Sequence, residues 1–325
     1  MSVTGSAVAV GIYDEVTYKL TTGVTLGRKA YFTECGIAAA RSLLQPNTIS
    51  GDRSRSLPLI GKLDVSGSLN TEISPEQAGF YLRHALGAPT TTGAGPYVHT
   101  FRPGALPVGF IVEKNWVPAG LTSKVEHFLG CRVGQATFEV PTEGPCTLNM
   151  SLQGANYAIA TAPLDASLQD VGHTGFAASD CTVLVAGAST TCVKQASITL
   201  DNTLDGDRYC IGGGGVRKDL PEGFAEVKGS ITALFEAFTL VDAALAGTDT
   251  TLELLMSRGD GLGSAGNESL SIKLDHARLA LTSPTISSPG GVEVSFEFTG
   301  YKSGATDKGL VVVLKNAQAN TLITA

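Results

Sequence analysis

An internal repeat runs through this chain of 325 residues. Residues 131–154 align without gaps with residues 277–300, at a constant shift of 146 positions. In each copy an apolar stretch and a loop precede an alternating segment that ends at Gly154 or Gly300. Alternation with a period of two is typical of a β-strand with one buried face, so strands are expected at about residues 146–152 and 292–298. A chain that repeats a β-rich unit is expected to fold as two related units.

A second pair of segments, residues 63–69 and 225–231, also alternates with a period of two. Each is followed by a predicted helix. The first helix should begin near Ser74, which can cap it, with Gln77 completing a capping box, and it should end at Gly87. The second helix should run from about Leu234 to Leu245, on an i, i+3, i+4 pattern, and end at Gly247.

A change of composition separates the two units. Residues 156–190 are rich in Ala, Ser, Thr, Gly and Asp, and their one short apolar run is residues 183–185. We therefore expect a first unit at residues 1–160 with an N-terminal arm, a connector with one strand at residues 161–190, and a second unit at residues 191–325. Each unit is long enough to bury its own core.

Composition limits the class of protein. Hydrophobic residues make up 43% and charged residues 16% of the chain, which describes an ordered, soluble, β-leaning protein. The longest apolar run, residues 310–314, is too short to cross a bilayer, and residues 1–13 lack the pattern of a signal peptide. Six cysteines without Cys-x-x-Cys spacing indicate reduced thiols. The protein is expected to be made in a cytoplasm.

Charge differs between the two parts of the chain. Residues 1–160 carry 12 basic and 11 acidic side chains, whereas residues 161–325 carry 11 basic and 19 acidic ones. No basic stripe is present, so specific binding of nucleic acid is disfavoured. A mildly acidic surface is instead compatible with letting nucleic acid slide past.

The sequence offers little chemistry. Its five histidines lie far apart without metal-ligand spacing, and no nucleophile elbow is present. The glycine run 212–215 lacks the Lys-Ser or Lys-Thr of a phosphate-binding loop. We therefore predict no catalytic, cofactor-binding or metal-binding residues, and no enzymatic activity.

Two polar, glycine-containing loops each carry a pair of basic residues. The first holds Asp52, Arg53 and Arg55, and the second holds Arg217 and Lys218. Such a composition suits a long hairpin tip that reaches a neighbouring subunit, although it equally suits a solvated turn.

Three further side chains are candidates for surface roles. Trp116, the only tryptophan, is either a core residue or an interface anchor, and we favour the interface. Glu293 and Glu297 occupy the outward face of a strand whose other face is apolar. They would line an acidic channel or simply face water.

The layout resembles the tail tube proteins of long-tailed bacteriophages, in the class with two tube domains in one chain. The resemblance covers about residue 22 to the end. It is carried by segments spread over both units: Val24–Gly27, Ser50–Arg55, Leu63–Leu69 with the helix and Leu86-Gly87 after it, His99–Pro103, the strand ending at Gly154, and Leu200–Leu204.

The resemblance implies a mainly β fold with a few helices. It implies two tandem domains, each a β-sandwich or partly closed barrel flanked by one α-helix. Three chains would form a ring with six domains around its axis, and rings would stack into a hollow tube through which DNA passes without specific binding. The implied partners are the tail tip or baseplate, the tape measure protein and the tail terminator, and the implied location is the virion tail, assembled in the host cytoplasm without a membrane or cofactor.

Stacking of rings calls for extended arms, for which residues 1–18, 49–57 and 211–220 are the candidates. Two other classes remain open from the sequence. One is a different virion component with tandem β-sandwiches, such as a baseplate or capsid decoration protein. The other is a carbohydrate-active β-sandwich enzyme, which would need paired carboxylates in a cleft.

Overall fold

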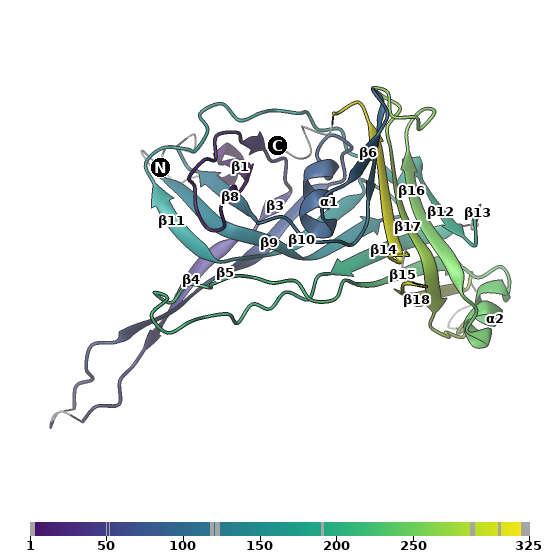
Figure 1. Ribbon diagram of the computed structural model, residues 1–325. Coiled ribbons are helices and arrows are strands. Elements are labelled where there is room, and N and C mark those ends of the chain that lie inside the picture. Colours follow the sequence, from purple (N-terminus) through teal and green to yellow (C-terminus); the bar gives the residue numbers. More distant parts are fainter. Residues whose placement is uncertain are drawn as a thin grey trace.

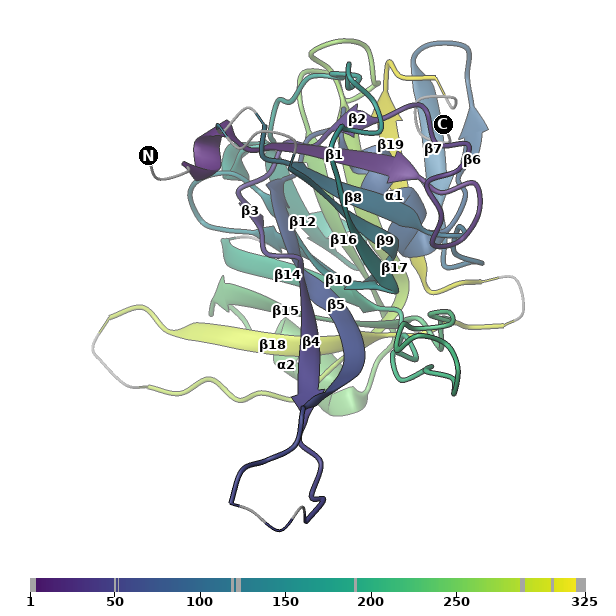
Figure 2. The same ribbon diagram turned by 90° about the vertical axis from the view of Figure 1, so that its left-hand side faces the viewer.

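The computed structural model describes residues 4–49, 51, 53–117, 120, 124–189, 192–286, 290–304 and 307–319. Within them the chain forms nineteen strands and two α-helices, and all of the strands belong to one hydrogen-bonded network (Figures 1 and 2). This confirms the prediction of a mainly β fold with few helices. Neither described helix is long and apolar enough to cross a membrane.

The elements fall into a first half, β1 to β11, and a second half, β12 to β19. The first half contains β1 (Ala9–Asp14), β2 (Arg28–Lys29), β3 (Glu34–Cys35), β4 (Ala38–Leu44), β5 (Leu59–Glu72), α1 (Ala78–Leu86), β6 (Thr90–Thr92), β7 (Tyr97–Phe101), β8 (Phe110–Asn115), β9 (Val125–Val140), β10 (Thr147–Gly154) and β11 (Asn156–Ala160). The second half contains β12 (Cys181–Val185), β13 (Ala188–Ser189), β14 (Val193–Asp201), β15 (Glu226–Leu234), α2 (Thr239–Ala246), β16 (Thr250–Ser257), β17 (Ser269–Leu279), β18 (Glu293–Gly300) and β19 (Leu310–Asn316).

The same strand pairing recurs in both halves with the same register. In the first half β5 pairs with β10, and Val65 lies opposite Gly154. In the second half β15 pairs with β18, and Val227 lies opposite Gly300. Glycine suits both positions because a Cβ at Gly154 would lie 2.6 Å from a methyl group of Val65, and one at Gly300 would lie 2.9 Å from Leu274. The strands expected from the period-two pattern are confirmed at all four places.

The other pairings also correspond. In the first half β1 pairs with β2 and β8, β8 with β9, β9 with β11, and β4 with β5. In the second half β12 pairs with β13 and β16, β16 with β17, β17 with β19, and β14 with β15. The hairpin of β6 and β7 has no such counterpart, and it pairs with β19 of the second half.

Besides the pairing of β7 with β19, a second strand pair joins the two halves into a continuous sheet. Residues 135–140 of β9 pair antiparallel with residues 196–201 of β14. At the end of this seam the amide of Asn202 donates to the carbonyl oxygen of Gly134 over 2.8 Å. The hydroxyl groups of Thr137 and Thr199, which lie opposite each other, are 3.0 Å apart.

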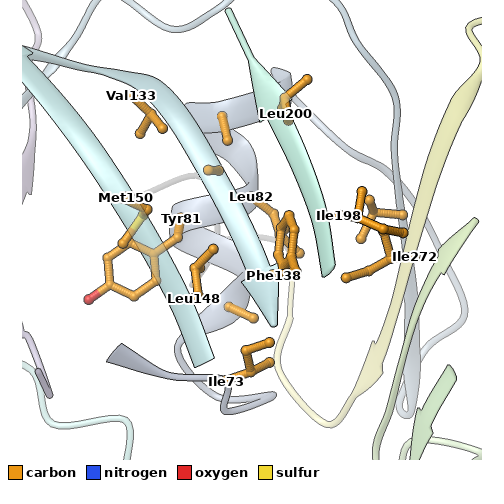
Figure 3. Packing of buried hydrophobic residues seen from close by; sticks show 14 of the residues in the cluster. Ile73, Tyr81, Leu82, Val133, Phe138, Leu148, Met150, Ile198, Leu200 and Ile272 are labelled. Atoms are coloured by element: carbon orange, nitrogen blue, oxygen red, sulfur yellow. The ribbon is translucent and has the colours of Figure 1, made fainter. Parts of the chain in front are cut away.

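The core runs across this seam. Figure 3 shows Tyr81 and Leu82 of α1 beside Leu148, Met150 and Phe138, which lie on β10 and β9. Ile198 of β14 and Ile272 of β17 belong to the same buried cluster, so apolar packing continues from the first half into the second. The two helices differ in packing, because eight of the nine residues of α1 are buried whereas only Val241 and Ala244 of α2 are.

The predicted ends of the helices are correct and the predicted starts are wrong. Both helices end at the expected glycines, Gly87 and Gly247, whose φ angles are 103° and 60°. Helix α1 begins only at Ala78. It has no capping box, because the side-chain amide of Gln77 donates a hydrogen bond to the carbonyl oxygen of Gly172 over 3.1 Å. Helix α2 begins at Thr239 rather than near residue 234, because the amides of residues 234 and 235 are hydrogen-bonded to Cys192 and Val292.

Two segments expected to be loose are built into the fold. Residues 9–14 form β1 between β2 and β8, with Val10, Ile12 and Tyr13 buried, so this part of the N-terminal segment is not a free arm. Residues 1–3 lie outside the described residues. The connector contains the expected strand, β12, and a second short one, β13. Its earlier part packs on the first half, where Phe176 is fully buried.

Candidate assembly surfaces

The hairpin of β4 and β5 projects far beyond the body of the protein (Figures 1 and 2). Apolar side chains are exposed along its arms and tip: Leu43, Leu44, Ile49, Leu57, Leu59 and Ile60. Exposed apolar groups on a strand hairpin are typical of a surface that another chain covers. Arg53 and Arg55 are exposed at its tip, whereas Asp52 lies outside the described residues.

A second long loop, residues 202–225 between β14 and β15, folds back onto the first half. In Figure 1 it runs from the second half toward the base of the β4–β5 hairpin. The carbonyl oxygen of Gly215 accepts a hydrogen bond from the amide of Leu63 over 2.7 Å. The hydroxyl group of Tyr209 donates to the carbonyl oxygen of Leu63 over 2.9 Å. We call residues 202–225 the return loop.

Arg217 fastens the return loop to the sheet. Its guanidinium donates to the carbonyl oxygens of Gly154 over 2.7 Å, Val65 over 3.1 Å and Gly206 over 2.7 Å. It also forms an ion pair with Asp64. Only 7% of the residue is exposed. A planar guanidinium with five donors suits such a set of acceptors, which an ammonium group could not satisfy equally.

These contacts refine what the sequence predicted for the basic loops. Arg217 is buried and makes its contacts within its own chain, while Lys218 beside it is exposed. Contacts of either loop with another subunit stay a prediction.

A cavity of about 390 Å³ opens at the equivalent place in the second half. Val227 and Gly300, the counterparts of Val65 and Gly154, line it together with Phe224 and Tyr301. Phe224 is 88% exposed. Sequence reasoning missed this cavity. The repeat contained a signal for it, because the valine recurs after 162 positions and the glycine after 146.

The acidic residues of β18 lie as the alternating pattern predicted. Glu293 and Glu297 are exposed, while Val294, Phe296 and Phe298 on the other face are buried. Glu293 forms an ion pair with Lys194 of β14. An outward acidic face is therefore confirmed, and its position on the wall of a channel stays a prediction.

Trp116 lies half-buried at the end of the β8–β9 hairpin. Its indole N–H donates to Glu126 over 2.7 Å, and the hydroxyl group of Tyr157 donates to the other oxygen of the same carboxylate over 2.7 Å. Because the polar end of the indole is satisfied within the chain, an interface role would use its ring faces. That role stays a prediction.

Several edges of the continuous sheet, including those of β6 and β11, have no neighbouring strand among the described residues, and two further open edges matter for assembly. One is the outer edge of β4. The other is residues 280–286, which follow β17 but form no strand, although the amide of Ala280 donates to Glu297 over 2.7 Å. Ile286 in this segment is 87% exposed.

One group of titratable side chains is closed to solvent. Glu113, only 1% exposed, accepts hydrogen bonds from the hydroxyl group of Tyr13 over 3.0 Å and the amide of Leu164 over 2.8 Å. Its carboxylate also lies 2.9 Å from His127 Nε2. Burial raises the pKa of Tyr13. A substrate could not reach this carboxylate, so the group is structural. Among the described residues no set of three or more potential ligands could hold a metal ion.

The family described as phage tail tube protein matches residues 5–300, which include both halves. Comparison with curated proteins gives no match. The chain belongs to the phage tail tube protein family and is a structural component of the phage tail, as its resemblance implied.

Proposed function

We propose that this protein polymerises as stacked rings of three chains, each chain contributing two duplicated tube domains, and that DNA leaves the virion through the lumen. The recurrence of the same pairings and registers in both halves supports a duplication. The number three rests on the resemblance to tail tube proteins with two domains in one chain.

The observation that carries the proposal is the seam between β9 and β14. If the two halves are equivalent, the edge that follows β17 corresponds to β9, and β4 corresponds to β14. The open edge of β4 and the open edge after β17 would therefore be the two sides of a second seam. A head-to-tail contact of this kind can close a ring, and it covers both of these edges.

The registers predict which residues meet in this second seam. With the shift of 146 positions, residues 281–286 of the second half correspond to residues 135–140 of the first half. Ala39 lies opposite Val65 in the first half, and Leu200 lies opposite Val227 in the second half. Residues 35–40 therefore correspond to residues 196–201. Residues 281–286 of one chain should then pair antiparallel with residues 35–40 of the next.

One detail of the edge fits this register. Pro284, which has no amide hydrogen, would lie opposite Ile37. The carbonyl oxygen of Ile37 already accepts a hydrogen bond from Lys114 over 2.7 Å. The proline would therefore leave no acceptor without a donor at this position.

Disulfide formation between separate chains tests the seam. Ser283 and Ala38 would lie opposite each other, as Thr137 and Thr199 do, and both are exposed in the single chain. We expect chains carrying Ala38→Cys and chains carrying Ser283→Cys, mixed and oxidised with copper phenanthroline, to form a covalent dimer. The exposed Cys192 and Cys210 would be replaced by serine in both chains.

The matched control is Thr282→Cys in place of Ser283→Cys, because a shift of one residue points the thiol to the other face of the sheet. Equal cross-linking by both variants would contradict the register. Electron microscopy and the mass of the assembled rings test the rest. Rings of a number other than three would refute the trimer, and a chain that stays monomeric even on preformed tail tips would refute polymerisation.

Other parts of the molecule would serve the assembled tube. The exposed apolar groups on the β4–β5 hairpin support a contact with a neighbouring chain, including one in the adjacent ring. The exposed carboxylates of Glu293 and Glu297 support an acidic lumen that repels DNA. The tail tip or baseplate, the tape measure protein and the tail terminator are the proposed further partners, with assembly in the host cytoplasm. No observation on the described residues favours a decoration protein, a baseplate protein or a carbohydrate-active enzyme instead.

A further inference from the structure

We propose that Arg55 of one chain enters the cavity beside Val227 and Gly300 of a neighbouring chain and binds there as Arg217 binds in the first half. This inference rests on the proposed self-assembly, and it identifies one side chain and one receptor site within it. The cavity would thus be an arginine site that the single chain leaves open.

The acceptors around Arg217 define what such a site needs. The guanidinium is held by the carbonyl oxygens of Val65 and Gly154 and by the carboxylate of Asp64. Val65 and Gly154 lie opposite each other in the pairing of β5 with β10. The carboxylate of Asp64 also accepts a hydrogen bond from Ser66 over 3.1 Å.

Each acceptor has a counterpart in the second half. Val227 and Gly300 lie opposite each other in the pairing of β15 with β18. Glu226 precedes Val227 as Asp64 precedes Val65. The carboxylate of Glu226 accepts from Lys228 over 2.8 Å, and Lys228 is the counterpart of Ser66. The set of two carbonyl groups and one carboxylate is therefore present twice.

The donor also has a counterpart, and it lies on the β4–β5 hairpin. Arg217 comes nine positions before Glu226, and Arg55 comes nine positions before Asp64, so the shift of 162 that relates β5 to β15 relates the two arginines as well. The same shift places Arg53 at Gly215, which has no side chain to contribute. Arg55 is exposed at the tip of the hairpin.

Space and direction agree with the assignment. The return loop, which carries Arg217, lies over the first half of its own chain, whereas the hairpin that carries Arg55 extends beyond the body (Figures 1 and 2). The cavity of about 390 Å³ is lined by Val227 and Gly300. Lys302 and Lys308 also line it, so the proposed arginine requires the carboxylate of Glu226, next to the lining residue Val227, and the two carbonyl groups to offset their charge.

Assembly of the full chain, followed by light scattering and negative-stain microscopy over a concentration series, tests the contact. We expect Arg55→Ala to raise the concentration needed for assembly at least about tenfold, since truncating one partner of a desolvated charged hydrogen bond weakens an interface that much or more. Arg55→Lys keeps the charge but loses the forked geometry, so it should fall between Arg55→Ala and the unaltered chain. Lys124→Ala, which removes an exposed cation elsewhere, should leave the threshold unchanged.

Exchange of the two charges tests whether Glu226 is the partner of Arg55. Arg55→Glu alone and Glu226→Arg alone should each impair assembly, and the double variant Arg55→Glu with Glu226→Arg should recover at least part of it. Circular dichroism of each monomer would check that the variants are folded.

The outcomes separate this contact from the proposed function. Rings or tubes that form from Arg55→Ala at the same threshold as the unaltered chain would refute the arginine contact and leave polymerisation intact. A double variant no better than the single ones would refute the pairing of Arg55 with Glu226. An unaltered chain that never assembles would refute the proposed function, and the contact with it.

Discussion

The guanidinium of Arg217 lies against the carboxylate of Asp64, although 153 positions separate the two residues along the chain. The contact ties the return loop of the second half to β5 of the first. Together with the β9–β14 seam, it makes the two halves one structural unit with a shared core. Its proposed counterpart in the second half is the cavity lined by Val227 and Gly300.

Removal of Arg217 should destabilise the single chain. Arg217→Ala leaves the carbonyl oxygens of Val65 and Gly154 without a donor and Asp64 without its partner. We expect the free energy of unfolding to fall by about 2–4 kcal/mol, measured by urea denaturation. Lys218→Ala changes an exposed neighbour and should cost less than about 0.5 kcal/mol. Equal midpoints for the two variants would contradict the anchoring role.

Gly229 should be intolerant of any side chain. A Cβ there would lie 2.1 Å from the carbonyl oxygen of Ser197 and 2.4 Å from the ring of Phe298. Gly229→Ala is therefore expected to cost at least about 2 kcal/mol of unfolding free energy, because backbone on the neighbouring strand would have to move. Gly134→Ala is the control, since its nearest neighbour would be 3.5 Å away. Similar thermal midpoints for both would show that β14 and β15 are less closely packed than described.

Glu15 should make stability depend on pH. Burial raises the pKa of Glu15 to about 7, although its carboxylate accepts hydrogen bonds from the amides of Gly130 over 2.6 Å and Lys19 over 3.1 Å. The folded chain binds this proton more tightly than the unfolded chain does. The resulting stabilisation is complete below about pH 4.3 and is lost as the pH rises through about 7.

The measurement compares urea unfolding of the unaltered chain with Glu15→Gln at pH 5 and pH 8. We expect the difference in unfolding free energy between them to change by about 2–3 kcal/mol, to the disadvantage of the unaltered chain at pH 8. Comparison of the two chains cancels the pH dependence that other groups contribute. Asp14 is one of them, because its contacts with His84 and Arg83 lower its pKa, and its contribution to stability changes with pH in the opposite direction. A difference that does not change with pH would mean that Glu15 is not protonated in the folded chain.

Reversal of charge on β18 should slow the passage of DNA. Glu297→Lys, alone or with Glu293→Lys, converts repulsive groups on the proposed inner wall into groups that attract phosphate. We expect phage particles that carry the variants to release their genome more slowly. Glu143→Lys makes the same charge change in the loop between β9 and β10 and should have a smaller effect. Unaltered release rates would mean that β18 does not face the lumen.

Local patterns in the sequence were sufficient for much of the secondary structure. The period of two predicted the strands that became β5, β10, β15 and β18. Glycine correctly marked both helix ends, because the backbone at Gly87 and Gly247 has a positive φ angle, which favours glycine. The predicted start of α1 was wrong because the side chain of Gln77 bonds to Gly172 instead of capping the helix. The predicted start of α2 was wrong because the amides of residues 234 and 235 bond to Cys192 and Val292.

The sequence by itself determined that this chain is a mainly β protein of a tail tube type, with alternating faces and two basic loops. Only the tertiary structure decided that residues 9–14 are a buried strand, that β9 joins β14, and that Arg217 is used within its own chain while Arg55 is exposed. The reason is physical: periodicity and turn residues act over a few positions. The pairing of distant strands and the filling of a buried arginine site depend on which surfaces meet, and that is set by the packing of the whole core.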